Sequence, residues 1–228
     1  MAAILNFPHG PNDGTTVGTA PTQGRAARPR ERGVPRTLLG VPGPVADAVG
    51  ALRAMRQPPW VTYREIPVPA RMAPYGIGVD MEVHDPAHAS GWLMLLHQPD
   101  VIPARQAWRC VAYLRAGLTP GEPRPLVPQL YWDMWAARAT PALVRAGSAA
   151  GTVTVCDNTT FDPHPGPAAP AHVGETAPAT SADCEMRISW TPAARAASEG
   201  PEERLIDAAG QVGLWTALLR DAAAAASG

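Results

Sequence analysis

Three histidines and one aspartate offer the most familiar metal-binding chemistry in this sequence. His84, Asp85 and His88 lie close together, and His97 would have to supply a third imidazole. If the strands on either side of residues 85–90 pair as a hairpin, His97 lies about 20 Å from His84, at roughly 3.3 Å per residue. Because a zinc–nitrogen bond is only about 2 Å long, we predict no metal site and no cofactor. His97, at a strand end among leucines, is interpreted as a structural histidine and kept as a candidate binding residue.

Acidic and phenolic side chains suggest a second chemistry, general acid–base catalysis. Tyr63, Glu65, Asp80 and Glu82 are predicted to lie on one open face of a sheet. Solvated strand faces usually carry such residues, so the favoured interpretation is a wet surface, and an enzyme using that face is the alternative.

Nucleophilic and phosphate-binding chemistry finds little support. The chain contains no G-x-S-x-G, G-x-G-x-x-G or phosphate-loop motif. Cys110 and Cys184 fall on apolar strand faces, and Cys156 has no evident catalytic partner. Since strand residues alternate between faces, Cys156 is predicted to point away from Cys184, and the two thiols should remain free.

A proline-bounded segment around Arg71 is the one motif that core packing does not explain. Pro69 and Pro74 stiffen it, and Arg71 and Tyr75 are presented close together. A stiff loop loses little entropy when it binds. We therefore take Arg71 and Tyr75, with His97, as the candidate binding residues, the alternative being a connector whose arginine caps a carboxylate.

The elements that position these residues follow from apolar periodicity. Helical spacing begins after Pro42, and period-two alternation marks most of the strands. The prediction is an α+β domain, an antiparallel sheet of about six strands covered by three helices. In chain order we expect a helix at 44–55, strands at 60–66, 77–83, 91–97 and 108–116, a helix at 129–145, strands at 152–156 and 184–190, and a helix from about 201.

Particular faces are predicted within these elements. The second helix should turn Leu130, Met134 and Trp135 to one side, and Glu202 and Glu203 should lie in the first turn of the last helix. Two sets should face the core: Cys184, Met186, Ile188 and Trp190 on the last long strand, and Leu205, Ala208, Val212, Trp215 and Leu219 on the last helix.

Composition sets limits on the function. The chain has 228 residues, 27 prolines and a net charge of −1, and it contains 19 arginines and no lysine. The first 40 residues are basic and the remainder is acidic, which does not favour direct nucleic-acid binding. There is no apolar run long enough for a membrane span and no signal-peptide pattern, so a cytoplasmic location is expected. We predict a disordered tail at 1–40, one domain at 41–222 with a mobile loop at 157–182, and a disordered end at 223–228.

Five short strings together resemble a known family. They are Ala51–Ala54, Pro69–Tyr75, Leu95–His97, Gly151–Thr154 and Ser189–Pro192. In this order they resemble an actinobacterial family described as domain of unknown function 3000, over roughly residues 45–220. The family pattern follows Leu-Leu-His with an acid and a proline, whereas this chain has Gln98 before Pro99. The resemblance implies no activity, cofactor or catalytic residue.

The order of elements is also similar to that of type III secretion chaperones, which are dimeric binding modules. That similarity implies a non-catalytic binding or adaptor protein, with a protein partner or self-association as a homodimer. The alternatives are a small enzyme and an accessory factor of RNA metabolism. Neither the ligand nor the partner follows from the sequence.

Overall fold

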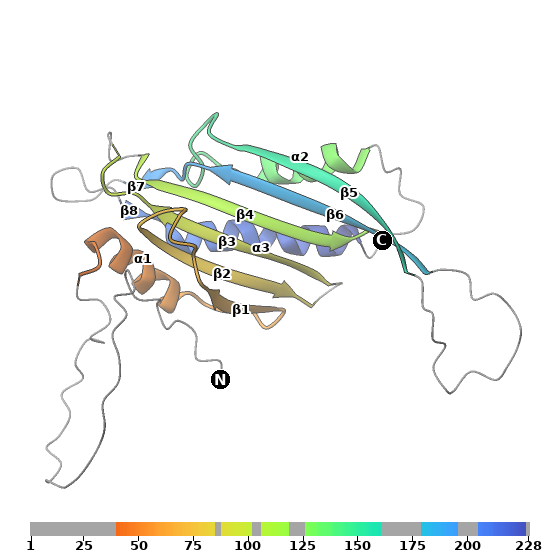
Figure 1. Cartoon of the computed structure of the whole chain (residues 1–228), viewed down its shortest axis with the longest axis horizontal. Coiled ribbons are helices and arrows are strands. Elements are labelled where there is room, and N and C mark those ends of the chain that lie inside the picture. The colour runs from red at the N-terminus through yellow and green to blue at the C-terminus, as the bar shows by residue number, and fades with distance from the viewer. Residues whose placement is uncertain are drawn as a thin grey trace, which may run out of the picture.

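The computed structural model describes residues 40–84, 88–101, 106–118, 126–160, 179–195 and 205–226. Three helices and eight strands are present in these ranges (Figure 1). The predicted tail at 1–40 and the interior of the predicted loop, 161–178, lie outside the described residues, apart from Gly40. In chain order the elements are α1 Gly43–Ala54, β1 Val61–Ile66, β2 Tyr75–Val83, β3 Ala89–His97, β4 Trp108–Gly117, α2 Val127–Arg138, β5 Ala150–Thr160, β6 Ala179–Trp190, β7 Ala194–Arg195, β8 Leu205–Ile206 and α3 Ala208–Ala225.

Six strands form one antiparallel sheet in the order β1-β2-β3-β4-β6-β5. The first four are a meander, and β6 then pairs with β4, so that β1 and β5 are the two edge strands. The predicted α+β class with a six-stranded antiparallel sheet and three helices is confirmed. β7 and β8 form a separate two-stranded pair.

All three helices contribute to a core on one side of this sheet. α3 packs against β2, β3 and β4, and Figure 1 shows it running behind these central strands. α1 and α2 lie beside α3. Three tryptophans from different elements meet at the centre: the ring centroids of Trp135 and Trp190 are 4.6 Å apart, and Trp215 lies about equally far from both, at 6.1 and 5.9 Å. The inward face predicted for β6 is confirmed, because Cys184, Met186, Ile188 and Trp190 are buried. The alternate apolar residues of β2 and β4 are buried in the same way.

A buried glutamine ties α3 to the sheet. Gln211 is 0% exposed, and its Oε1 accepts hydrogen bonds from Trp190 Nε1 at 2.8 Å and from Cys110 Sγ at 3.6 Å. Its Nε2 donates to the backbone oxygen of Leu143 at 2.7 Å. A buried polar group costs little when it is fully hydrogen-bonded, so this side chain joins α3 to β4, β6 and the segment after α2.

The last helix begins later than predicted. α3 starts at Ala208, and the carboxylate of its N-cap, Asp207, accepts a hydrogen bond from Gly210 N at 2.9 Å. Leu205 belongs to β8, and the predicted first-turn acids Glu202 and Glu203 lie outside the described residues. At its other end α3 continues to Ala225, so the predicted disordered end at 223–228 is wrong for residues 223–225.

Two further predictions need correction. α2 ends at Arg138, and its buried residues are Val127, Tyr131 and Trp135, whereas Leu130 is 45% exposed. The apolar side predicted for this helix is therefore wrong, except at Trp135.

β5 and β6 are also longer than predicted: residues 157–160 and 179–182, assigned to the loop at 157–182, pair with each other.

Candidate functional site

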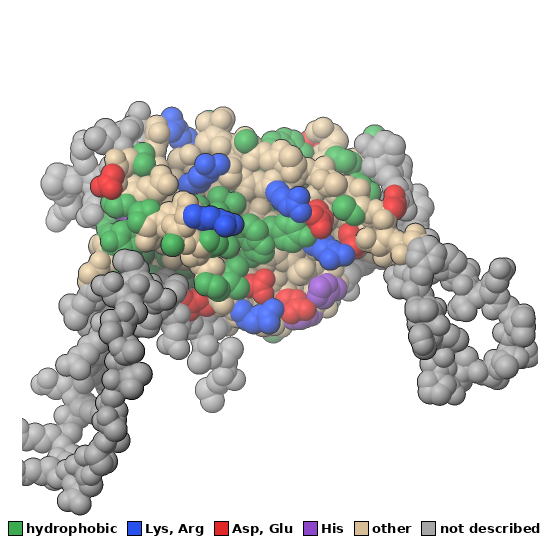
Figure 2. All heavy atoms as spheres, in the orientation of Figure 1, with side chains coloured by type: hydrophobic (Ala, Val, Ile, Leu, Met, Phe, Trp, Pro, Cys, Tyr) green, Lys and Arg blue, Asp and Glu red, His purple; other side chains and the backbone are tan. Residues whose placement is uncertain are grey.

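The side of the sheet opposite the helices carries the candidate site, and we call it the open face. Alternation places the following side chains there, in strand order: Thr62, Arg64 and Ile66 on β1, Asp80 and Glu82 on β2, Trp92, Met94 and Leu96 on β3, Arg109, Val111, Tyr113 and Arg115 on β4, and Asp183, Glu185, Arg187 and Ser189 on β6. Figure 2 shows hydrophobic side chains across the middle of this face with arginines around them. The sheet is therefore apolar on both sides near its centre.

The link between β1 and β2 covers part of the open face. Val68, Met72 and Ala73 from this link pack with Met94 and Leu96 of β3 in a second apolar cluster, separate from the main core. Glycines on β2 permit the close approach: a Cβ at Gly76 would lie 2.9 Å from Val68 Cγ1. The cluster leaves Trp92 and Val111 only partly buried, so the link covers this apolar surface incompletely.

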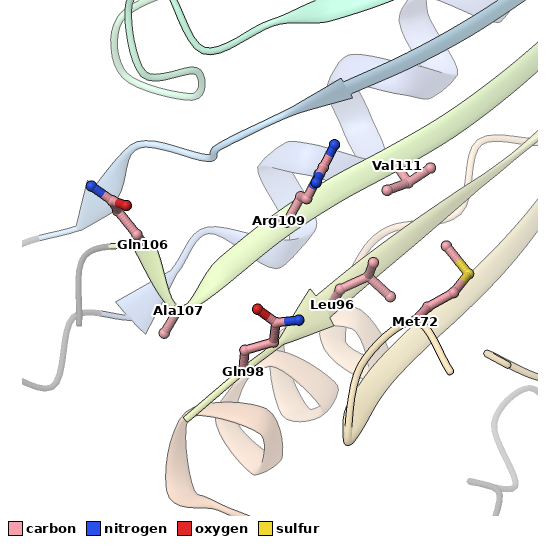
Figure 3. A pocket seen from close by; sticks show the side chains of 7 residues that line it. All are labelled: Met72, Leu96, Gln98, Gln106, Ala107, Arg109 and Val111. Carbon is pink, nitrogen blue, oxygen red and sulfur yellow. The ribbon is translucent and has the colours of Figure 1, made fainter. Parts of the chain in front are cut away.

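A hollow of about 300 Å³ lies beside that link (Figure 3). Its apolar lining comes from Met72, Leu96, Ala107 and Val111, and its polar lining from Gln98, Gln106 and Arg109. In Figure 3 the side chains of Leu96, Met72 and Val111 lie toward one end and those of Gln98 and Gln106 toward the other, with Arg109 between them.

Arg109 differs from the other arginines on the open face. Arg64, Arg115 and Arg187 form ion pairs with Asp80, Asp183 and Glu185, respectively. Arg109, which is exposed, donates a hydrogen bond to the hydroxyl of Ser189 at 2.8 Å. Among the described residues, no carboxylate forms an ion pair with it. The hollow therefore combines an apolar floor with a cation that still has hydrogen-bond donors to offer.

The three predicted binding residues do not form one site. Arg71 is exposed on the link and directly precedes Met72, which lines the hollow. Tyr75 and His97 are paired across β2 and β3 on the helix side of the sheet. The His97 ring, 5% exposed, lies 4.7 Å from that of Trp108 and 6.4 Å from that of Tyr75. Tyr75 and His97 thus lie together on the helix side of the sheet, and of the three candidates only Arg71 lies near the open face.

The predicted acid–base face is also divided by the structure. Tyr63 and Glu65 point to the helix side, where the hydroxyl of Tyr63 is hydrogen-bonded to that of Thr216 at 3.1 Å. Only Asp80 and Glu82 lie on the open face. A hydrogen bond from His88 is the main cause that lowers the pKa of Glu82 below its ordinary value. A carboxyl group held ionised in this way is a poor general acid at neutral pH.

The positions of the cysteines and histidines bear on the predictions about thiols and metal ligands. Cys110, Cys156 and Cys184 are all free, and Cys156 pairs in register with Asp183. Cys156 therefore points to the opposite face from Cys184, as predicted. His88 lies beside the start of β3 and His97 at its end, and Asp85 lies outside the described residues. In the described part of the chain, no three metal-ligating side chains are grouped to hold an ion.

Sequence reasoning missed Gln98, Gln106 and Arg109 as a group. One signal was present in the sequence: residues 92–96 are all apolar, and a strand that is apolar on both faces requires a second cover beyond the helices. Alternation on β4 places Arg109 and Val111 on that second face. What the sequence did not show is which segment forms the cover.

Within the described residues, no helix is both long enough and apolar enough to cross a membrane.

Comparison with known proteins identifies the family. No curated protein and no solved structure matches the chain significantly. One family model matches residues 41–226, which is most of the chain and all of the sheet and helices described above. The chain therefore belongs to the family described as protein of unknown function (DUF3000).

Proposed function

We propose that this chain is a non-catalytic binding or adaptor protein that docks a partner protein on its open face. The observation that carries the proposal is the second apolar cluster with its adjoining hollow, on the side of the sheet that none of the described helices covers. Apolar side chains grouped on the surface of a folded protein often mark an interaction site, whereas single scattered ones do not.

Charge on the open face favours a protein over a nucleic acid. On the strands of this face, the four arginines are offset by four carboxylates: Arg64, Arg109, Arg115 and Arg187 against Asp80, Glu82, Asp183 and Glu185. A surface with this balance does not supply the excess of cations that a phosphate backbone requires. Trp92 and Tyr113 stack on each other at 6.0 Å, and Arg187 lies 5.6 Å over the Tyr113 ring. These contacts occupy ring surface that bases would otherwise use for stacking.

The enzyme alternative receives less support from the same residues. Asp80 is paired with Arg64 at 2.9 Å, and Glu82 is hydrogen-bonded to His88 at 2.9 Å. Catalytic carboxylates that act as acids near neutral pH usually have raised pKa values, whereas the pKa of Glu82 is lowered. The similarity in element order to type III secretion chaperones adds no argument, because no solved structure matches the chain.

A cytoplasmic location is part of this proposal. Three free thiols, two of them buried, are typical of proteins that fold in a reducing compartment. Cell fractionation with an antibody to the native protein tests the location. Recovery in an extracellular or envelope fraction would contradict it.

The docking surface is tested by native co-purification with matched variants. Met72→Glu and Val111→Glu introduce a charge into the open face from the link and from β4, respectively, whereas Ala224→Glu places the same charge at an exposed position of α3. Each variant is first compared with the wild type by thermal unfolding. We expect a stoichiometric protein partner to be retained by the wild type and by Ala224→Glu, and to be lost from both open-face variants.

Three other outcomes would contradict the proposal. The first is retention of the partner by both open-face variants. The second is retention of a small molecule or nucleic acid, instead of a protein, by the wild type. The third is a homodimer in sedimentation that Val111→Glu leaves intact. In the last case self-association would use another surface, for which the exposed Leu126 and Leu130 of the α2 region are the first residues to change.

A further inference from the structure

We propose that the hollow receives a partner segment in which an acidic side chain stands next to an aliphatic one. Arg109 binds the carboxylate, and Met72, Leu96 and Val111 contact the aliphatic side chain. This inference rests on the proposed function and specifies which residues of the partner the open face recognises.

The apolar end of the hollow provides the site for the aliphatic side chain. Leu96 is 5% exposed and forms part of the second apolar cluster, so its position is fixed by packing. Met72 and Val111 are each partly buried against the same cluster. Methionine adapts to differently shaped apolar groups, so this end accepts several aliphatic side chains. The whole hollow has a volume of about 300 Å³, at the lower limit of typical ligand pockets, which suits a few side chains better than a large cofactor.

Arg109 provides the site for the carboxylate. A guanidinium carries five N–H donors, and the contact with Ser189 Oγ at 2.8 Å uses one of them. The planar guanidinium matches a carboxylate in bidentate geometry. The other open-face arginines already have carboxylate partners within the sheet. A carboxylate of a bound partner can therefore form an ion pair with Arg109 without displacing a carboxylate of this sheet.

Two glutamines complete the hollow at its polar end. Gln98 and Gln106 are both exposed and line the hollow together with Arg109. A primary amide both donates and accepts hydrogen bonds, as does a peptide group. The two side chains are therefore suited to the backbone of a bound segment. The order of groups along the hollow in Figure 3 places the backbone near the glutamines and the aliphatic side chain toward Met72.

The surroundings favour a polypeptide over a free metabolite. The hollow is continuous with the second apolar cluster through Leu96, Met72 and Val111. A small carboxylate would leave that adjoining apolar surface uncovered, whereas a peptide segment continues across it. A phosphate group is less well matched, because Arg109 is the one arginine among the residues that line the hollow, and phosphate sites usually gather more than one positive charge.

A peptide selection followed by variant binding tests the inference. A random peptide library displayed on phage is selected against the full-length protein, and enriched sequences are synthesised and titrated by fluorescence anisotropy. We expect enrichment of Asp or Glu next to Leu, Ile, Val or Met. Arg109→Gln should weaken binding about tenfold to a hundredfold, since a hydrogen bond to a charged group is lost. Arg220→Gln removes an exposed arginine from α3, on the helix side, and should leave binding unchanged.

Two paired changes make the test specific for the carboxylate. Changing the peptide acid to its amide should weaken binding to the wild type, and the same change should have little effect on binding to Arg109→Gln, because both alter one contact. Gln98→Glu adds a carboxylate to the hollow. It should compete for Arg109 and weaken binding by a similar factor, whereas adding the same change to Arg109→Gln should weaken binding less.

The outcomes separate this inference from the proposed function. Enriched peptides that lack an acid but lose binding to Val111→Glu would overturn the inference and leave the open face as the docking surface. Enriched peptides whose binding is unaffected by Val111→Glu would overturn both. Binding of a fluorescent oligouridylate that Arg109→Gln abolishes would also overturn both, in favour of a nucleic-acid ligand.

Discussion

Replacing Gln211 by methionine should lower the free energy of unfolding by about 1–3 kcal/mol. Methionine has a similar length and no group to accept or donate strongly. The substitution leaves the indole N–H of Trp190 without its acceptor in a fully buried position. A buried donor without a partner costs about 1–3 kcal/mol.

The other contacts of Gln211 change this value only slightly. The thiol of Cys110 is a weak donor at 3.6 Å, so its loss contributes little. The backbone oxygen of Leu143 retains a second hydrogen bond, from Ala193 N at 2.9 Å, and is not left unpaired. The burial of extra apolar surface by methionine offsets part of the loss. The net effect should therefore be dominated by Trp190.

Urea unfolding followed by tryptophan fluorescence measures this difference. Gly213→Ala, on the exposed side of the same helix with no atom within 4 Å of the added methyl group, is the control and should not destabilise. A double-mutant cycle with Trp190→Phe isolates the hydrogen bond. If Gln211→Met costs less than about 0.5 kcal/mol, or if the two changes are additive within about 0.5 kcal/mol, the interaction with Trp190 does not exist as described.

Four further predictions follow from burial and register. Trp190→Ala should cost about 3–5 kcal/mol in urea unfolding and Arg187→Ala, on the open face, less than about 1 kcal/mol; equal losses would refute the assigned faces. Gly91→Ala should fail to fold stably in thermal melts, since the new methyl group would lie 2.2 Å from a backbone oxygen of β4, and a melting temperature like that of the wild type would contradict this close approach. Alkylation should find three thiols in the denatured protein, and in the native protein it should modify the half-buried Cys156 first. Faster modification of Cys110 or Cys184 would contradict the burial of these two cysteines. Burial raises the pKa of Glu65 in the folded protein, so Glu65→Gln should stabilise the protein at pH values above that folded pKa. The stabilisation should disappear as the pH falls below the pKa of the carboxyl in the unfolded chain, because the carboxyl is then protonated in both states. A stabilisation that persists at low pH would show a different cause.

Most of the fold was accessible from the sequence because alternation is a strong signal. On β6 every second residue from Cys184 to Trp190 is buried, and that pattern alone predicted the face. The same logic predicted that Cys156 points away from Cys184, and the observed register, in which Val153 pairs with Met186 and Cys156 with Asp183, agrees. The register follows because a slip by one residue would exchange the two faces of a strand.

Helix boundaries and faces were less accessible, for identifiable reasons. α2 contains two overlapping pairs at helical spacing, Leu130 with Met134 and Tyr131 with Trp135, and spacing alone cannot choose between them. The larger aromatic pair is the one that is buried. For α3 the acids before residue 205 resembled a first turn, but Asp207 is the side chain that caps the helix. An aspartate directly before the apolar run was the better indicator.

The error at Tyr63 and Glu65 shows how a functional interpretation can override a structural one. The β1 pattern places Val61, Tyr63 and Glu65 on one face, so an inward Val61 requires the other two to point inward as well. Grouping them with Asp80 and Glu82 as acid–base candidates ignored that requirement. The hollow on the other face was not recognised because its residues come from the β1–β2 link, β3 and β4 and share no local spacing.

The central strands explain why this protein has an apolar open face at all. A sheet covered by helices on one side is usually polar on the other, and the outer ends of β4 and β6 follow that rule with their arginine–carboxylate pairs. β3 does not, because Met94 and Leu96 face away from the helices and are buried by the β1–β2 link. If this face served stability alone, the link would be expected to cover all of the apolar surface. Instead the apolar surface continues past it to Val111, where it meets Arg109 and the two glutamines. An apolar floor that extends beyond its own cover, toward a cation without a carboxylate partner in the described chain, is the arrangement expected where a second molecule supplies the remaining contacts.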